Sequence, residues 1–378
     1  MKNLAIIYGG NSCEKDISII TALQAIGAVD KSKYKIYPIY WSDGFYILEN
    51  FNSIDTYSGG KQAGKKVIFD KSGLYAVKRT KIKKIADIDC ALLCTHGGAG
   101  ENGSIQGLLE VNSIPYTSPG VLASAVGMDK AVCKMICKRL SLPTLPYGAV
   151  FEEDGKESID KIVARIGFPL IVKPAKQGSS IGISICKTPE ELEENLKVAF
   201  IYDKKVVIEK ALTDFKEINC ACIRSKGKIY PSTLEEPVGW QDFLTFEDKY
   251  MSGGSKITKN SAKRIFPANI SENDSKKIQN MTVKLYCALE CKGIIRCDFL
   301  LDKESGEIYL NEINTIPGSL AGYLYEDRDL NLKDIIDIIV EDAIKESKEQ
   351  RSYRYSSKVL QYYAKSNANA CKTSIKNV

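Results

Sequence analysis

The sequence has very little histidine and no two cysteines at C-x-x-C spacing, and both absences argue against whole classes of site. His96 is the only histidine in 378 residues, so a Ser-His-Asp or Cys-His enzyme would depend on this one side chain. The twelve cysteines include no C-x-x-C pair, so the spacing of a zinc ribbon is missing. Most of them lie in apolar stretches, where a free thiol behaves as a small hydrophobic group. These scarcities argue against hydrolases and histidine-rich metal sites.

Long hydrophobic runs and a strong charge excess are also missing. No window approaches the roughly 20 consecutive apolar residues of a membrane span, and the apolar run 4–8 is too short for a signal peptide. Lys and Arg number 53 against 47 Asp and Glu. Six of the basic residues lie in the tail 351–378, which has no acidic residue, so the rest of the chain is balanced. We expect a cytoplasmic protein with no nucleic-acid or membrane partner; the tail either is solvated or disordered or touches an acidic partner.

The hydrophobic pattern of the N-terminal third predicts strands alternating with helices. Strands are expected at 4–8, 34–41 and 89–95, and helices at 17–29 and 105–111. Residues 42–85 contain turn signals and only short strand-like runs, so we expect irregular structure there. Such alternation is typical of an α/β unit with a mostly parallel sheet. We therefore place an α/β domain at residues 1–124.

The rest of the chain is predicted to form two further folded segments. A helix at 124–139 and strands around a glycine-rich turn place a small α+β lid subdomain at 125–212. Strands and helices continue through a C-terminal domain at 213–350. Within it, the long irregular stretch 236–265 is expected to be either functional or disordered.

A glycine- and serine-rich turn at 178–182 is the first candidate for chemistry. Lys173 ends the preceding strand, and Gly178, Ser179 and Ser180 open the turn. Glycines let backbone N–H groups approach phosphates, and serine hydroxyls add donors. There is no P-loop and no standard dinucleotide fingerprint. The turn is therefore interpreted either as a phosphate site or simply as a turn.

A cluster of oxygen-bearing side chains near residue 300 is the second candidate. Glu312 and Asn314 are two residues apart on a predicted strand and so share a face. Asp298 lies in the neighbouring predicted strand, with Arg296 on its own face. Carboxylate and amide oxygens suit Mg²⁺ beside nucleotide phosphates. A solvated strand face is the alternative, but the flanking apolar residues indicate buried strands, where such charges need a reason.

The turn 314–318 follows directly and is the third candidate. Its backbone N–H groups could stabilise an oxyanion near a reacting carbonyl, or the turn merely ends a strand. Together the segments 178–182, 296–299 and 311–318, in this order, resemble the D-alanine–D-alanine ligase family of ATP-grasp enzymes. Other matching segments are 9–14, 96–107, 128–130 and 248–250, so the resemblance covers about residues 3–345.

The resemblance implies an ATP-grasp fold behind an N-terminal parallel α/β domain. It also implies an ADP-forming ligase that joins two small amino acids through an acyl phosphate, with D-alanine as the default substrate, for peptidoglycan precursor synthesis. Two Mg²⁺ ions, or Mn²⁺ in their place, are implied at Asp298, Glu312 and Asn314. A homodimer through the N-terminal domain is implied as well.

The resemblance also assigns roles to individual residues. Those implied to bind ATP are Lys130, Lys173, Gly178, Ser180, Glu209, Lys210, Ala211, Leu212 and Glu217, of which 209–212 form the adenine hinge. The implied catalytic residues are Glu14, Ser179, Tyr250, Arg296 and Gly318. The implied substrate-binding residues are His96, Glu101, Lys249, Ser319, Tyr323 and Leu324. Lys249 and Tyr250 lie in the long loop, which is expected to close over the site.

The segment after Gly318 departs from the family pattern. Tyr323 stands where a serine that binds the second substrate's carboxylate is expected, and the proline that usually follows is missing. Lys249 and Tyr250 argue against a hydroxy-acid acceptor. Two alternatives therefore stay open: a ligase with a changed acceptor, such as D-serine or another amino acid, and a nucleotide-binding regulator that has lost ligation.

Overall fold

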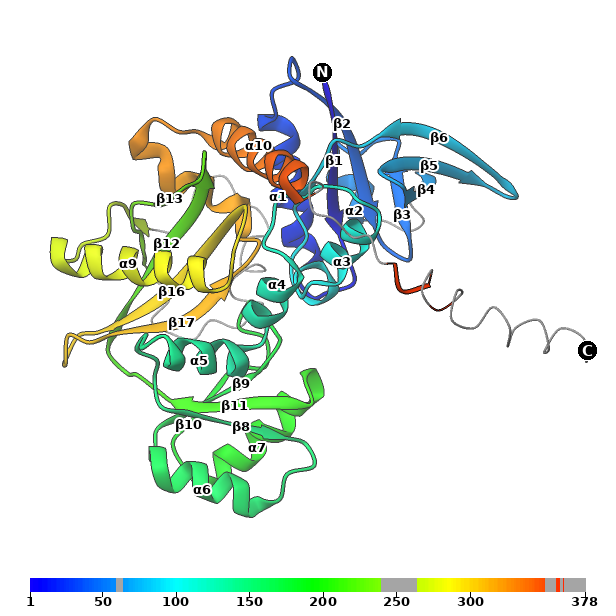
Figure 1. Ribbon diagram of the computed structural model, residues 1–378. Helices are drawn as coiled ribbons and strands as arrows, with labels where there is room; N and C mark the ends of the chain where they lie inside the picture. The colour runs from blue at the N-terminus through cyan, green and yellow to red at the C-terminus, as the bar shows by residue number, and fades with distance from the viewer. Residues whose placement is uncertain (59–63, 239–263, 351–357, 361–362, 364–378) are drawn as a thin grey trace, which may run out of the picture. The chain divides into compact units, whose positions relative to one another are not determined.

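The computed structural model describes residues 1–58, 64–238, 264–350, 358–360 and 363. The chain divides into two compact units, Met1–Ile344 and Lys345–Val378. In the second unit, the end of helix α10 (Leu332–Gln350) carries an ion pair between Lys345 and Glu349, one turn apart. The first unit contains three main sheets and the candidate site (Figure 1).

The N-terminal sheet has seven strands in the order β6-β5-β4-β3-β2-β1-β7. Its parallel part consists of β1 (Lys2–Gly9), β2 (Tyr34–Trp41) and β7 (Cys90–Leu93). The strands are nearly continuous hydrophobic runs, as expected for a parallel sheet buried on both faces. Helix α1 (Lys15–Ala28) packs against β1, and α3 (Ser104–Val111) follows the loop after β7. These elements agree with the sequence-based prediction.

The same sheet continues into an antiparallel part where the sequence predicted irregular structure. The added strands are β3 (Phe45–Leu48), β4 (Gly64–Asp70), β5 (Gly73–Lys78) and β6 (Lys81–Asp87), and α2 (Asp55–Ser58) lies between β3 and β4. The expectation of a mostly parallel sheet therefore describes only β2-β1-β7. The antiparallel strands were missed because β4 and β6 are rich in exposed lysine, which hides the hydrophobic alternation of a strand.

A four-stranded antiparallel sheet, β10-β9-β11-β8, forms the central part. Its strands are β8 (Tyr147–Phe151), β9 (Leu170–Pro174), β10 (Ser184–Cys186) and β11 (Lys205–Lys210). Helices α6 (Lys156–Ile166) and α7 (Pro189–Tyr202) pack against it (Figure 1). Thr188 caps α7 by accepting a hydrogen bond from the Glu191 N–H.

The helix predicted at 124–139 is in fact two helices, α4 (Val121–Met128) and α5 (Lys130–Arg139). Asp129 leaves the helical conformation between them, and its carboxylate accepts hydrogen bonds from the N–H groups of Ala131 and Val132. An aspartate can therefore start a new helix inside one continuous apolar pattern. The break brings Lys130 to the first turn of α5, where it faces the site.

The C-terminal sheet, β13-β12-β16-β17, is also antiparallel. Its strands are β12 (Phe215–Ser225), β13 (Lys228–Pro231), β16 (Ile294–Asp302) and β17 (Ile308–Asn314), with α9 (Glu272–Ala288) packed on one face. The pair β14 (Glu236–Pro237) and β15 (Arg264–Ile265) joins the two ends of the long loop, whose residues 239–263 lie outside the described part. Two 3-10 helices, η1 (Gly98–Gly100) and η2 (Gly318–Arg328), are also present.

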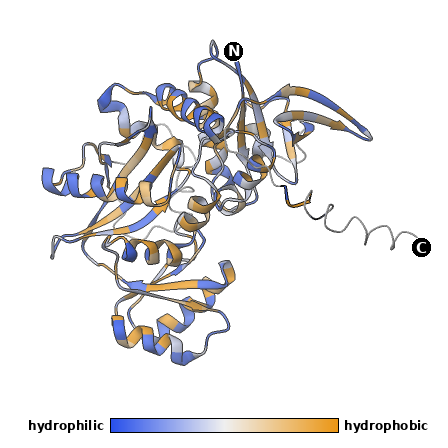
Figure 2. Cartoon of the chain, viewed as in Figure 1, coloured by the Kyte–Doolittle hydropathy of each residue, from blue (hydrophilic) through white to orange (hydrophobic). Residues whose placement is uncertain are grey.

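Apolar side chains on the strands form the core of each sheet. Figure 2 shows the hydrophobic colour concentrated on strands such as β11, with hydrophilic patches along α6 and α9. Nine of the eleven described cysteines are buried and none of the eleven forms a disulfide, as expected for small apolar side chains. None of the described helices is long and apolar enough to cross a membrane.

Candidate active site

Two adjoining cavities lie between the sheets and share the wall residues Ser180, Glu217 and Glu312. The first, which we call the nucleotide cavity, lies between the central and C-terminal sheets. Its other lining residues include Lys130, Lys173, Gly178, Lys210, Ala211 and Leu212. The second, which we call the amino-acid cavity, is also bordered by the N-terminal domain, through Glu14, His96 and Glu101. All but one of the described residues expected to bind ATP line the first cavity.

The exception is Glu209, whose side chain is fully buried behind the cavity wall. Its carboxylate contacts two lysines, Lys134 at 2.5 Å and Lys173 at 2.9 Å. Burial by itself raises the pKa of Glu209, but the two ammonium groups outweigh it, and the pKa lies below its ordinary value. Lys173 also donates to the Asn311 amide oxygen at 3.0 Å. The cluster carries one net positive charge at the cavity wall.

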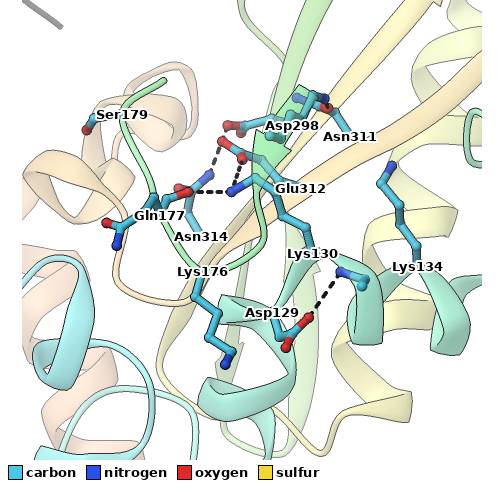
Figure 3. A network of polar contacts seen from close by, with 12 residues as sticks. Asp129, Lys130, Lys134, Lys176, Gln177, Ser179, Asp298, Asn311, Glu312 and Asn314 are labelled. Atoms are coloured by element: carbon cyan, nitrogen blue, oxygen red, sulfur yellow. Dashed lines mark hydrogen bonds and ion pairs between the residues drawn. The ribbon is translucent and has the colours of Figure 1, made fainter. Parts of the chain in front are cut away.

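Lys130 connects the glycine-rich turn to strand β17. Its ammonium donates to the Gln177 carbonyl oxygen at 2.5 Å and lies 3.5 Å from the Glu312 carboxylate (Figure 3). Like Lys173, it is more than nine-tenths buried. Two lysines thus point from different elements toward the same end of the nucleotide cavity, which is the arrangement that a triphosphate requires.

The three predicted metal ligands come together on two neighbouring strands. Asp298 of β16 is paired with Glu312 of β17, and Arg296 with Asn314. The Arg296 guanidinium binds Asp298 through two hydrogen bonds, at 2.7 and 2.8 Å, and Asn314 donates to the same carboxylate at 2.9 Å. Burial raises the pKa of Asp298, while Arg296 opposes that shift.

These donors fit a magnesium ion that also binds phosphate. Two carboxylates and an amide are hard oxygen ligands, and Mg²⁺ usually completes its shell with phosphate and water oxygens. Among the residues that the structure describes, no group of three or more His, Cys, Asp or Glu side chains forms a metal cage. These residues would provide part of a coordination shell, and one of them, Glu312, lines both cavities.

Glu14 and Ser179 meet at the floor of the amino-acid cavity. The Ser179 hydroxyl donates to the Glu14 carboxylate. Glu14 lies on the turn before α1 and Ser179 on the glycine-rich turn, so the contact joins segments that are distant in the sequence. A Cβ atom at Gly178 would come within 2.7 Å of the same carboxylate, so a larger residue there would require the Glu14 side chain to shift. Burial, and then Glu101, raise the pKa of Glu14. A buried carboxylate at this place suits the ammonium group of an amino acid.

Glu101 has a second role that the sequence did not indicate. It is buried, and its carboxylate accepts hydrogen bonds from the N–H groups of Thr315 and Ile316 at 3.0 and 3.1 Å and of Gly97 at 3.1 Å. The N-terminal domain thereby holds the turn that leads to Gly318. Gly318 itself lines the amino-acid cavity, as the oxyanion proposal requires.

His96 is held in the same wall by a residue that the sequence analysis did not select. Its Nε2 lies 3.0 Å from the Thr21 hydroxyl, which also accepts the Ser319 N–H at 3.2 Å. Thr21 is on α1 and faces inward at helical spacing from Glu14. That spacing could have indicated Thr21, but ordinary core positions of a helix show the same spacing. Ser319 and Tyr323 line the cavity, whereas Leu324 is fully buried in the core and does not. The Leu324 side chain therefore packs in the core, and a role of Leu324 in substrate binding stays a prediction that concerns its backbone.

Three further residues at the site were missed, and two predicted ones cannot be placed. Asn311 accepts a hydrogen bond from Lys173, Lys134 shares the Glu209 carboxylate with Lys173, and Arg264 lines the amino-acid cavity. Lys134 lies one helical turn after Lys130, a spacing that is equally typical of a solvated helix face. Lys249 and Tyr250 lie outside the described residues.

Burial lowers the pKa of His96 to about 4, against the action of Glu14, which raises it. Since His96 is the only histidine, its imidazole signals can be followed by NMR, and we expect them to titrate near pH 4. In the unfolded chain the same imidazole titrates near 6.5, so between pH 4 and 6.5 the unfolded chain binds more protons than the folded one. The free energy of unfolding should therefore fall as the pH drops through this window. His96→Gln should remove that part of the pH dependence. Titration near 6.5 in the folded protein would contradict the burial.

Comparisons with known proteins agree with this geometry. The family description "D-ala D-ala ligase N-terminus" matches residues 3–119, and "D-ala D-ala ligase C-terminus" matches residues 136–341. The chain is 37% identical to a D-alanine–D-alanine ligase of Thermosipho africanus, covering 94% of this chain and 97% of the relative. A similar relative from Bacillus cytotoxicus is 34% identical, covering 93% and 98%.

Solved structures give the same result. The D-alanine–D-alanine ligase of Helicobacter pylori superposes with a TM-score of 0.72 at 31% identity, covering 90% of this chain and 98% of that structure. The VanG D-Ala:D-Ser ligase of Enterococcus faecalis superposes with a TM-score of 0.76 at 26% identity, with the same coverage. These two relatives are named for different second substrates.

Proposed function

The chain belongs to the D-alanine–D-alanine ligase family, and from that premise we propose that it joins two D-alanine molecules while converting ATP to ADP and phosphate. The observation that carries this proposal is the wall shared by the two cavities. Glu312 and Ser180 border both of them, so the phosphate end of a bound nucleotide would meet the carboxylate of an amino acid held at Glu14. An ATP-grasp ligase needs this juxtaposition.

The first step is the activation of a carboxylate. Glu14 and Ser179 would hold the ammonium group of the first D-alanine, and Lys130 and Lys173 would hold the phosphates. A carboxylate oxygen attacks the γ-phosphorus, and the bond to the ADP oxygen breaks, which leaves an acyl phosphate. Positioning and charge neutralisation supply most of the catalysis of such a transfer. Magnesium at Asp298, Glu312 and Asn314 would neutralise phosphate charge when bound.

The second step forms the peptide bond. The neutral amine of the second amino acid attacks the acyl carbon, and its surplus proton passes to solvent. The tetrahedral oxyanion would be stabilised by the Gly318 N–H and by Arg296. The carbon–oxygen bond to the phosphate then breaks and releases inorganic phosphate. Water must be excluded because it would hydrolyse the acyl phosphate, and the proposed closing segment for that purpose is the loop 236–265.

Several finer assignments belong to the same proposal. We propose two metal ions, a homodimer, a cytoplasmic location and the division of the folded chain at residues 124 and 212. The division is supported by the sheets, because the strands of each main sheet all come from one of the three segments. The hinge 210–212 is supported as an adenine site by its place in the wall of the nucleotide cavity.

Phosphate release from Mg-ATP, measured over D- and L-amino acids singly and in pairs, tests the proposed function. D-alanine alone should release phosphate and give the mass of D-alanyl-D-alanine. Release only after a different second amino acid is added would mean that the acceptor is changed. Bound ATP without release over the whole panel would overturn the ligase proposal in favour of a regulatory protein.

A further inference from the structure

The amino-acid cavity is strongly acidic and contains few cations. The described carboxylates in its wall are Glu14, Glu101, Glu217, Glu235, Asp298 and Glu312, and the described permanent cations are Arg264 and Arg296. An acceptor amino acid brings its own carboxylate into this wall. Binding that anion among so many like charges requires a cationic partner.

Arg296 is already committed to Asp298 and, in the proposed mechanism, to the tetrahedral oxyanion. Its Nε and Nη2 atoms both bind Asp298, at 2.7 and 2.8 Å, so one edge of the guanidinium fork is already used. Asp298 is buried, and moving Arg296 away would leave its carboxylate uncompensated. Arg296 is therefore fixed beside the metal ligands.

Arg264 is differently placed. Its guanidinium carbon lies 4.7 Å from the centre of the Tyr323 ring and 5.3 Å from that of Phe266. Its nitrogens lie 3.7 Å from both Glu235 and Glu326, which is beyond hydrogen-bond distance. Its side chain is 35% exposed. Within the described part of the chain, the two rings and these two longer ion pairs hold the guanidinium in the cavity wall, and its hydrogen-bond donors have no closer partner there.

Tyr323 is itself held in one orientation. Its hydroxyl donates to the Glu235 carboxylate at 2.9 Å, and the same oxygen accepts the Asn219 amide at 3.1 Å. Glu235 and Asn219 are both buried. A fixed aromatic face is a suitable support for a guanidinium, which stacks on rings and binds carboxylates with two donors.

We propose that Arg264 binds the carboxylate of the acceptor amino acid and that Tyr323 positions Arg264 for it. This rests on the proposed ligase function and adds the residues that would recognise the acceptor's carboxylate. The substitution of a tyrosine for a serine at position 323 then does not abolish the acceptor site. It replaces recognition by a hydroxyl with recognition by a stacked guanidinium.

The test is a competition between D-alanine and D-alaninamide as acceptors. The amide cannot be activated by ATP because it has no carboxylate, so it enters only as the second substrate. With both present at equal concentration, the wild type should favour the dipeptide over the dipeptide amide. Arg264→Gln should lower this product ratio about tenfold or more, the value of a charge-assisted hydrogen bond. The KM of the first D-alanine should stay within about twofold.

Two further variants separate recognition from damage to the fold. Tyr323→Phe keeps the stacked ring and should keep the ratio, whereas Tyr323→Ala should lower it as Arg264→Gln does. Arg79→Gln changes an exposed arginine on the turn between β5 and β6 and should change nothing. An unchanged ratio in Arg264→Gln, or a wild type that does not favour the carboxylate, overturns the proposal. If the wild type forms no dipeptide at all, the proposed function itself fails.

Discussion

Replacing Glu312 by glutamine is expected to lower ATP turnover on the order of 10³-fold. Glu312 lies in the wall shared by both cavities, beside Asp298 on the paired strand. A metal ion at such a place supplies several kcal/mol of charge stabilisation, and each 1.4 kcal/mol or so is worth a factor of ten in rate. The glutamine keeps the size of the side chain but removes one anionic ligand. Steady-state ADP release measures the effect.

Metal binding should be lost together with turnover. Mn²⁺ titrated in the presence of ADP, followed by electron paramagnetic resonance, should show weakened binding in Glu312→Gln. The matched control is Glu304→Gln, an exposed carboxylate on the turn between the same two strands, which should bind Mn²⁺ and turn over normally. Asp298→Asn is harder to interpret because it also removes the carboxylate partner of Arg296. Wild-type turnover in both Glu312→Gln and Asp298→Asn would refute the metal assignment.

Replacing Glu209 by glutamine should destabilise the folded protein by about 3–5 kcal/mol, the usual cost of removing one partner from a buried ion pair. Its carboxylate is the counter-charge of both Lys134 and Lys173, and all three side chains are less than a tenth exposed. Without the Glu209 carboxylate, the ammonium groups of Lys134 and Lys173 would be buried close together with no counter-charge between them. Urea unfolding at pH 7 measures the difference from wild type.

The pH dependence of this effect has a definite sign. Because the folded pKa of Glu209 lies below its unfolded value, about 4.3, the cluster stabilises the fold fully above that value. The stabilisation is lost as the pH falls through the folded pKa. The difference between wild type and Glu209→Gln should therefore be the same at pH 7 and pH 6 and shrink only below about pH 4.

Two variants complete this test. Lys134→Met leaves a neutral pair and should cost less than Glu209→Gln. The double variant should also cost less than the sum of the two single changes, because contacting residues do not act independently. Glu194→Gln, on the exposed side of α7, is the control and should unfold like the wild type. Strict additivity of the two single changes would contradict a shared cluster.

Spacing in the sequence predicted those parts of the site whose residues lie on a single strand or a single turn. Glu312 and Asn314 share a strand face as their two-residue spacing requires, and Asp298 is paired with Glu312 on the next strand. The family resemblance supplied what spacing could not, such as the approach of Ser179 to Glu14 from 165 residues away. The ATP-grasp fold was predicted in the same way and is confirmed.

The parts that were missed depend on contacts between distant segments. Lys134 and Glu209 are separated by 75 residues and meet only because α5 packs beside β11. Neither residue is unusual in its own window, since a lysine on a helix is normally solvated. The burial of the Leu324 side chain was not foreseen for the related reason that a motif gives the order of residues but not which side chains turn toward the core.

The most direct test of the central claim, activation of a carboxylate by ATP at the shared wall, is an oxygen-transfer experiment. D-alanine labelled with ¹⁸O in its carboxylate is incubated with the enzyme and Mg-ATP, and the released phosphate is examined by ³¹P NMR. An acyl phosphate requires that one labelled oxygen appear in the phosphate for each dipeptide formed. Unlabelled phosphate, or release of AMP in place of ADP, would contradict the account.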